Sequence, residues 1–188
     1  MNFRMIGAAL LLVVASACSN PTARLEPLPQ VAMDAAGYEL GAGDKIRIVV
    51  GGFDALSNDY NVSDVGTVSL PMLGSIAADG KTTSQLETHI AGLLESREIA
   101  VSPVVSVQIE AYRPFYILGE VKVPGAYPYV PGMTVLTAIS IAGGHTFRAD
   151  TKTYGINRTI RGQQTKGRGD ADTQVMPGDT VIVNETWF

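Results

Sequence analysis

Glycine and proline interrupt this chain so often that its apolar segments stay short. The 188 residues include 20 Gly and 10 Pro, and no long apolar run follows residue 18. Several of the short segments alternate apolar and polar side chains, which is the period of a strand with one buried face. Short alternating segments between Gly and Pro are typical of a fold that is rich in strands and turns.

The N-terminal segment has a different composition. Residues 1–4 carry one basic side chain, residues 5–14 are almost purely apolar, and small residues precede Cys18. These are the parts of a secretory signal peptide. The apolar run is about a dozen residues long, whereas a membrane-spanning helix needs roughly 20. We therefore expect residues 1–17 to be a signal peptide that is cleaved between Ala17 and Cys18.

Cys18 is the single cysteine of the chain, so an intramolecular disulfide is excluded. Its position directly after small residues resembles the lipobox of bacterial lipoproteins, in which the cysteine is acylated. Several acyl chains anchor a protein durably, because each buried CH₂ group contributes about 0.8 kcal/mol. Ser19, rather than Asp, follows the cysteine, which by the same resemblance favours the outer membrane. An ordinary secretory peptide that leaves a free cysteine is the alternative.

The expected mature chain has 171 residues with 13 basic and 18 acidic side chains, a net charge of −5. This length suffices for one large or two small domains that bury roughly 70% of the extended surface. The mildly acidic balance argues against a general nucleic-acid binder. Residues 18–36 contain several prolines and no sustained period, so we interpret them as a tether. Folding is expected to begin near Tyr38.

The first half of the body contains a helix between groups of short strands. Alternation predicts strands over residues 45–50 and 105–109, and a hairpin is expected between residues 60–62 and 67–70. Thr82 and Gln85 form a capping-box pattern at the start of the helix. The apolar side chains of that helix share one face and are expected to be core: Leu86, Ile90, Leu93 and Leu94.

The second half repeats this alternation of strands and a helix. Strands are predicted over residues 115–121, 154–160 and 180–183, and Thr134 caps a second helix that ends at two glycines. Residues 161–174 are polar and Gly-rich, and no structure is assigned to them. A Gly-Asp turn precedes both the first and the last strand, at Gly43-Asp44 and at Gly178-Asp179. We interpret this echo as a repeated structural device.

The glycines at the predicted turns can be explained by backbone geometry alone, without comparison with other proteins. A turn with positive φ, or a close approach of two backbones, accepts only Gly without strain. Proline ends a strand because it cannot donate to the ladder. We therefore predict structural rather than substrate-contacting roles for Gly43, Asp44, Gly66, Pro71, Gly74, Gly119, Gly125, Gly143, Gly144, Gly178 and Asp179.

In this order, the motifs resemble the polysaccharide export family of outer-membrane lipoproteins. Residues 38–48 and 64–74, with the capped helix and residues 104–109, are similar to the export domain of that family. Residues 116–121, 124–127, 131–136 and 142–144 look like its SLBB module, a soluble-ligand-binding β-grasp domain. The resemblance implies an α+β fold, in which an export domain of short strands plus a capped helix is followed by one β-grasp-like SLBB module.

The same resemblance implies a division of the chain and a function. The expected parts are a signal peptide (1–17), a lipidated tether (18–36), a polysaccharide export domain (37–112), an SLBB module (113–162), and a polar loop with a closing strand (163–188). Such proteins form a homo-oligomeric ring that conducts polysaccharide across the outer membrane, with the body in the periplasm. They dock on an inner-membrane polysaccharide co-polymerase, which is often linked to a tyrosine kinase. No cofactor or nucleic acid is implied.

Two other functions stay open at this point. A periplasmic lipoprotein could use the β-grasp module to hold a soluble glycan or another ligand. A scaffold could bridge the inner-membrane export complex to the outer membrane without conducting polymer itself. Ring-forming assembly would distinguish an exporter from the binding lipoprotein.

The sequence offers no catalytic or metal-binding constellation. His89 and His145 lie on separate segments without a second ligand at productive spacing, and no Gly-x-Ser-x-Gly motif is present. Residues 59–70 begin like a calcium loop but lack its Gly at the sixth place and its final Glu. We therefore expect neither an enzyme nor a metal site.

One stretch in this acidic chain is basic. From residue 145 to residue 168 there are six basic side chains and one acidic side chain, Asp150. Such a patch could attract an acidic glycan or lipopolysaccharide phosphates through screened electrostatics, although a solvated edge is the simpler interpretation. The candidate glycan contacts are Arg148, Lys152, Arg158 and Arg161.

Overall fold

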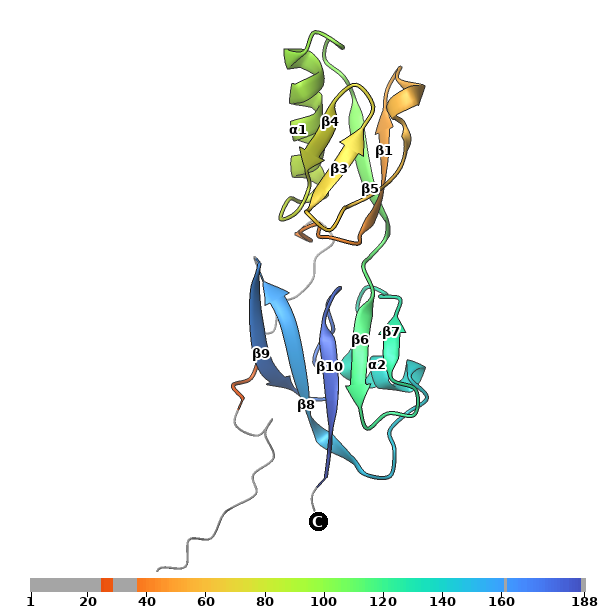
Figure 1. Cartoon of the computed structure of the whole chain (residues 1–188), viewed down its shortest axis with the longest axis vertical. Coiled ribbons are helices and arrows are strands. Elements are labelled where there is room, and N and C mark those ends of the chain that lie inside the picture. Colours follow the sequence, from red (N-terminus) through yellow and green to blue (C-terminus); the bar gives the residue numbers. More distant parts are fainter. Residues whose placement is uncertain (1–24, 29–36, 161, 187–188) are drawn as a thin grey trace, which may run out of the picture.

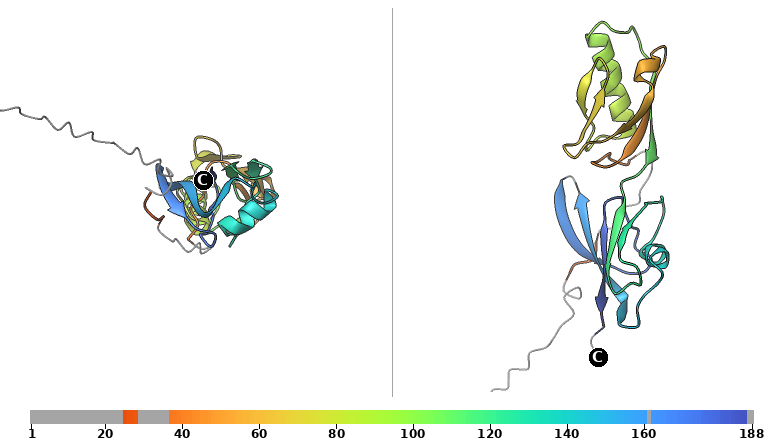
Figure 2. Two further views of the ribbon diagram at one scale, coloured as in Figure 1. Left: turned by 90° about the horizontal axis from the view of Figure 1, so that it is seen from below. Right: turned by 45° about the vertical axis from the view of Figure 1, so that its right-hand side comes forward.

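The alternation of Lys45–Val50 produces a strand, β1, whose side chains Ile46, Ile48 and Val50 are buried on one face. The computed structural model describes residues 25–28, 37–160 and 162–186. Two separate hydrophobic cores lie within these ranges, one before residue 112 and one mainly after it. Figure 1 and the right-hand view of Figure 2 show two domains stacked end to end, connected by the segment between β5 and β6.

The first domain is built on an antiparallel sheet of three strands in the order β2-β1-β5. Beside β1, it contains β2 (Asn58–Asn61) and β5 (Val105–Ala111). A short 3-10 helix, η2 (Asp54–Leu56), follows β1, and a hairpin of β3 (Thr67–Leu70) and β4 (Gly74–Ala77) completes the core with helix α1. Strands and helix therefore share one α+β core.

Helix α1 (Thr83–Ser96) starts where the capping box predicts. The Thr82 hydroxyl oxygen accepts from the Gln85 N–H at 3.3 Å, and the Gln85 side chain accepts from the Thr82 N–H at 3.0 Å. Leu86, Ile90 and Leu94 are buried, and Leu93 packs against the same core half-buried. Both the cap and the apolar stripe are confirmed.

The expected pairing of residues 60–62 with 67–70 is wrong. Strand β2 pairs with β1, whereas β3 pairs with β4 in a two-stranded sheet of its own. The turn before β3 is present, with the Gly66 N–H donating to the Ser63 carbonyl at 2.9 Å. The chain changes sheets at this turn because the edge of β1 is available to β2, a non-local contact that local sequence does not reveal.

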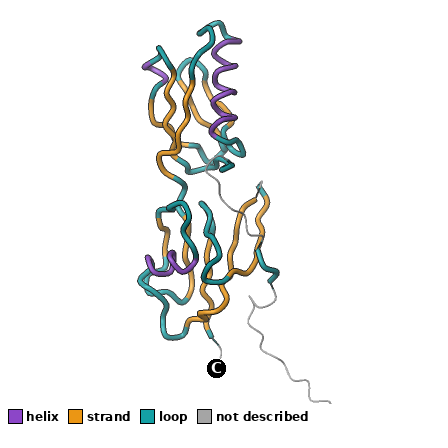
Figure 3. The backbone as a smooth tube through the Cα atoms, turned by 180° about the vertical axis from the view of Figure 1, so that it is seen from behind, coloured by secondary structure: helices purple, strands orange, loops and turns teal. Residues whose placement is uncertain are grey.

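The second domain has a five-stranded mixed sheet in the order β7-β6-β10-β8-β9. Its strands are β6 (Phe115–Gly119), β7 (Gly125–Tyr127), β8 (Ala149–Ile160), β9 (Gln163–Gly169) and β10 (Thr180–Glu185). Strand β10 runs parallel to β6, and the other pairs are antiparallel. Helix α2 (Val135–Ile141), capped by Thr134, packs on one face of this sheet. Figure 3 shows both helices against their strands.

The polar stretch to which the sequence assigned no structure contains a complete strand. Strand β9 pairs with β8 over its whole length, from Gln163 opposite Ile160 to Gly169 opposite Tyr154. The polar loop expected from residue 163 is thus corrected to an edge strand. Polar side chains suit an edge, which faces water and has only one neighbouring strand of the sheet.

Part of the expected tether lies against this edge. Residues 26–28 run parallel to β9: the Leu28 N–H donates to the Arg168 carbonyl at 3.0 Å, and the Arg168 N–H donates to the Glu26 carbonyl at 2.9 Å. Leu28 is buried, and a Cβ at Gly167 would lie 2.5 Å from its Cγ atom. The missing side chain of Gly167 therefore makes the space that Leu28 fills, and the chain before residue 29 is held by the second domain.

We predict that Leu28→Asp releases this segment. Burying a leucine side chain contributes about 2 kcal/mol, so its loss should speed hydrogen exchange of the Arg168 amide by roughly tenfold or more. Glu26→Gln is the matched control, because among the described residues the contact of Glu26 with β9 is through its backbone carbonyl. Hydrogen exchange measured by NMR distinguishes the two variants, and equal protection of Arg168 in both would contradict the docking of this segment.

Candidate functional site

The two Gly-Asp turns share one geometry. In the first, an Asp44 carboxylate oxygen accepts from the Gly41 N–H at 2.8 Å; in the second, an Asp179 oxygen accepts from the Met176 N–H at 2.8 Å. Both aspartates are almost completely buried. The glycine before each has positive φ, +93° at Gly43 and +83° at Gly178. Each turn therefore buries a carboxylate at the start of a strand and requires cationic or hydroxyl donors around it.

Asp44 receives those donors from its own domain and from the connection to the second domain. The Tyr38 hydroxyl donates to it at 2.7 Å. The Arg113 backbone N–H donates at 2.7 Å, and Nη1 of the Arg113 guanidinium donates at 3.1 Å. Burial raises the pKa of the Tyr38 hydroxyl, as does the adjacent Asp44 charge, so Tyr38 stays a donor at physiological pH.

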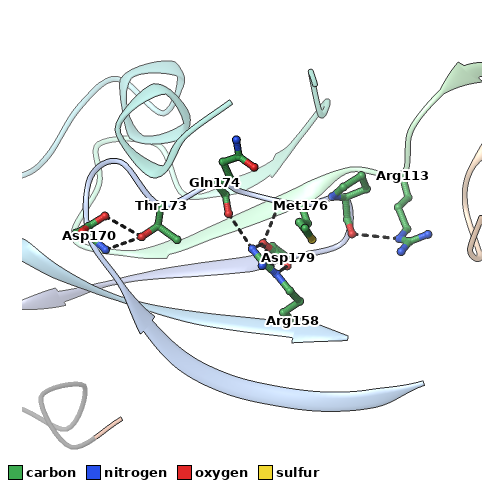
Figure 4. A network of polar contacts seen from close by, with 8 residues as sticks. Arg113, Arg158, Asp170, Thr173, Gln174, Met176 and Asp179 are labelled. Atoms are coloured by element: carbon green, nitrogen blue, oxygen red, sulfur yellow. Dashed lines mark hydrogen bonds and ion pairs between the residues drawn. The ribbon is translucent and has the colours of Figure 1, made fainter. Parts of the chain in front are cut away.

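Asp179 is held by an arginine from its own domain. Nε and Nη2 of Arg158 donate to its two oxygens at 3.0 and 2.7 Å, and Nη2 also donates to the Gln174 carbonyl at 2.8 Å (Figure 4). Arg158 is only 4% exposed. Burial raises the pKa of the Asp179 carboxyl, although the hydrogen bonds from Arg158 oppose that shift. The carboxylate therefore depends on Arg158 to stay ionised.

Arg113 touches both turns. Its Nε donates to the Pro177 carbonyl at 3.2 Å while its Nη1 binds Asp44. A Cβ at Gly41 would lie 2.0 Å from Arg113 Nη1, and one at Gly178 would lie 3.0 Å from Arg113 Nε. Glycine at both places therefore makes room for one guanidinium group between the two domains. Arg113 was not among the predicted site residues, because its partners Asp44 and Pro177 lie far from it in the sequence.

Three tyrosines continue this junction. Tyr38 and Tyr112 meet edge to face, with ring centroids 5.0 Å apart, and Tyr112 meets Tyr129 in the same way at 5.3 Å. Tyr38 belongs to the first core and Tyr129 to the second. The guanidinium carbon of Arg113 lies 5.6 Å from the Tyr38 ring centroid, a cation–π distance. These contacts favour one relative orientation of the two domains.

Most of the predicted turn glycines have the expected conformation. Positive φ occurs at Gly43, Gly66, Gly74, Gly119, Gly143, Gly144 and Gly178. At Gly119 a Cβ would lie 2.0 Å from the Val183 carbonyl oxygen, so the parallel β6–β10 contact also requires glycine. Pro71 directly follows β3, as predicted. Gly125 differs: it has neither positive φ nor an atom within 4 Å of its Cβ position, because it lies in β7 opposite Ile117.

The four proposed glycan contacts do not form one surface patch in the structure. Arg158 is buried against Asp179 and must be removed from any surface patch. Arg148 is half-exposed and forms an ion pair with Glu185. Lys152 is exposed, and Arg161 lies outside the described residues, as do Ala17 and Cys18. The reason for the correction is register: Arg158 follows Tyr154 and Ile156 on the core face of β8.

The remaining chemical candidates do not assemble into a reactive centre. His89 is exposed, and His145 Nε2 lies 3.0 Å from the Tyr154 hydroxyl. Within the described ranges, no three His, Cys, Asp or Glu side chains are placed to hold a metal ion. Among those residues there is also no helix of sufficient length and hydropathy to cross a bilayer.

We predict that Arg158→Gln destabilises the protein by roughly 3 to 5 kcal/mol, because Asp179 would remain buried without its cation. Arg148→Gln, which removes the same charge from an exposed pair, should cost under about 1 kcal/mol. Urea unfolding of both variants measures the difference. Similar losses in the two variants would contradict a structural role for the buried pair.

We also predict that Arg113→Met loosens the domain junction. Spin labels at exposed Ser96 and Thr159, introduced as cysteines in a Cys18→Ser background, report the distance between the domains. The distance distribution should broaden in Arg113→Met. It should stay unchanged in Arg47→Met, which removes an arginine from an exposed ion pair of the first domain. An unchanged distribution in Arg113→Met would show that the tyrosines suffice.

Comparison with known proteins assigns both domains. Residues 32–110 match the family described as polysaccharide biosynthesis/export protein, and residues 114–168 match the SLBB domain. The junction residues Tyr112 and Arg113 lie between the two matched ranges. The chain is 40% identical over 118 residues to the exopolysaccharide production protein ExoF of Rhizobium meliloti (strain 1021). That alignment covers 57% of this chain and 28% of the relative, so the chain matches just over a quarter of that protein's length.

The two matched ranges correspond to the two domains of the structure, an export domain of short strands and one capped helix followed by an SLBB module. Arg113 bonds to both domains at their junction. The chain therefore carries a polysaccharide biosynthesis/export domain followed by one SLBB domain, and in this arrangement it matches the polysaccharide export family.

Proposed function

We propose that this protein is a lipid-anchored outer-membrane component of a machine that exports capsular or extracellular polysaccharide, and that it works as a homo-oligomeric ring. The observation that carries this proposal is the export domain joined to an SLBB module through Arg113 and the two aspartate turns. A ring of identical subunits closes only when each subunit presents its two contact surfaces at a fixed angle. A junction that holds the two domains in one orientation supplies that condition.

The docked N-terminal segment supports a particular orientation. Cys18 precedes Glu26 by eight residues, so an acylated Cys18 would lie no more than about 28 Å from the β9 edge. The second domain would then lie close to the outer membrane and the export domain would extend into the periplasm. In that position the export domain is the part that meets an inner-membrane polysaccharide co-polymerase, with or without a linked tyrosine kinase.

A protein that transports a polymer must bind the polymer without holding it tightly at any one site. A polymer held at one tight site would leave slowly, because differences in affinity between related complexes lie mostly in the dissociation rate. Many weak polar contacts, repeated in every subunit, orient the chain and let it advance. The protein therefore guides polysaccharide and neither makes nor breaks its bonds.

The proposal predicts that a deletion strain loses extracellular polysaccharide. Wild-type protein should restore it, whereas Cys18→Ser should restore it poorly, because the subunit is no longer held at the membrane. The measurements are cell-surface and secreted polysaccharide, with membrane fractionation to follow the protein. Ser19→Ala is the matched control, since it changes the neighbouring residue and leaves the acylated sulfur in place.

Two results would count against the proposal. Normal polysaccharide in the deletion strain would favour a periplasmic binding lipoprotein. Full export with Cys18→Ser, released from the membrane fraction, would show that the anchor is not part of the mechanism.

A further inference from the structure

The second domain has a sheet face that α2 does not cover. Phe115 and Ile117 point into the core shared with α2, so the alternate residues of β6, Tyr116 and Leu118, lie on the opposite face. They are 44% and 49% exposed. In Figure 1 this sheet is seen with α2 behind β6 and β7, and no other described helix or strand lies over it.

Strand register arranges the side chains of this face into two rows. Residues paired across neighbouring strands share a face. One row crosses all five strands, and the second crosses four of them, two residues further along. In order from β7 to β9, the first row is Ala126, Tyr116, Thr180, Asn157 and Lys166, and the second, from β6, is Leu118, Ile182, Gly155 and Arg168.

The rows have a graded chemistry. Aromatic and aliphatic side chains occupy β6, polar side chains occupy the middle of the first row, and a cation ends each row on β9. With strands about 4.8 Å apart, five strands span roughly 19 Å, which is enough for several linked sugar rings. Between Ile182 and Arg168 the second row passes through Gly155, which has no side chain and is buried.

This face is basic within an acidic protein. Neither row contains an acidic residue, and Lys166 and Arg168 are exposed and form no ion pair with any residue of the described ranges. Residues 37–112 carry four basic and ten acidic side chains, a net charge of −6, whereas residues 113–188 carry eight and six, a net charge of +2. An anionic polymer is therefore repelled by the first domain and attracted by the second.

We propose that this face, here called the β6–β9 track, binds an acidic polysaccharide. Tyr116 presents an aromatic surface to the C–H groups of a sugar ring. Thr180 and Asn157 offer hydrogen bonds to hydroxyl groups, and Lys166 and Arg168 bind the carboxylates. The inference rests on the proposed function and adds to it the sheet face and the charge class of the polymer.

A second copy of the chain is the competing occupant. The cores of subunit interfaces are depleted in charged residues, Lys among them. The track ends on two cations that form no ion pair within the described part of the chain, and polar residues lie in its middle, which suits a hydrated, charged ligand better. Exposed contacts of this kind are individually weak, as a sliding polymer requires.

The first test is titration of the full chain, purified in detergent, with oligouronate from alginate and with neutral dextran oligosaccharides of equal length. Lys166→Gln/Arg168→Gln should weaken oligouronate binding about tenfold. The matched control, Lys122→Gln/Lys152→Gln, removes two exposed charges of the same domain. It should retain binding, because Lys152, although a candidate contact from the sequence, has the strand parity of Tyr154 and Ile156 and so lies on the opposite face of β8 from the track. Tyr116→Ala should weaken binding several-fold, whereas Tyr116→Phe, which keeps the ring, should not.

Three results would overturn the inference. Equal weakening by both charge pairs would show a diffuse field rather than a track. Competition by inorganic phosphate at equal concentration would show a simple anion site. Loss of self-association in Lys166→Gln/Arg168→Gln, measured by analytical ultracentrifugation with oligouronate binding intact, would assign the face to a second copy.

A complementation experiment separates this inference from the proposed function. If the deletion strain exports polysaccharide normally, the proposed function fails whatever the track binds. If the deletion abolishes export and the track variant binds oligouronate like wild type, the proposed function stands and the track is wrong. Weaker binding together with reduced export supports both.

Discussion

The guanidinium group of Arg113 is the contact on which the arrangement of the two domains depends. Burying the Asp44 carboxylate costs several kcal/mol unless charged and polar donors surround it. Two of those donors, Tyr38 and Gly41, come from the first domain, while the other two come from Arg113 itself. When the first domain satisfies its buried carboxylate, it therefore also fixes the segment that leads into the second domain.

Asp44 and Asp179 differ in where their cationic partners come from. Asp179 lies in the same kind of turn, but its cation, Arg158, comes from β8 of the same sheet, so the pair closes a single domain. Asp44 instead takes its cation from the inter-domain connection. The same device thus serves one domain internally and joins two domains, and the Pro177 carbonyl, which accepts from Arg113, brings the two turns together.

Capping and alternation predicted local structure well, and the failures occur where a strand pairs with a more distant partner or shows no apolar alternation. The capped helix at Thr82 and the strand over residues 45–50 follow from spacing alone. The pairing of β2 with β1 depends on a partner more distant in the sequence, whereas β9 was missed because its polar, Gly-rich residues show no apolar alternation, although it pairs with the strand directly before it. Arg158 could have been found: alternation through Tyr154 and Ile156 places it on the core face, where a buried arginine needs an acid such as Asp179.

Strand register also allows one domain to be rigid and yet to present exposed cations on its surface. Alternation along β8 sends Arg158 inward, where it neutralises Asp179, and sends Asn157 outward to the open face. A buried, paired cation contributes to stability and cannot contact a polymer. The exposed cations on β9 contribute little to stability and remain accessible to a ligand. Strand parity therefore divides the basic residues of this sequence into those that hold the fold and those that can bind, a division that net charge does not show.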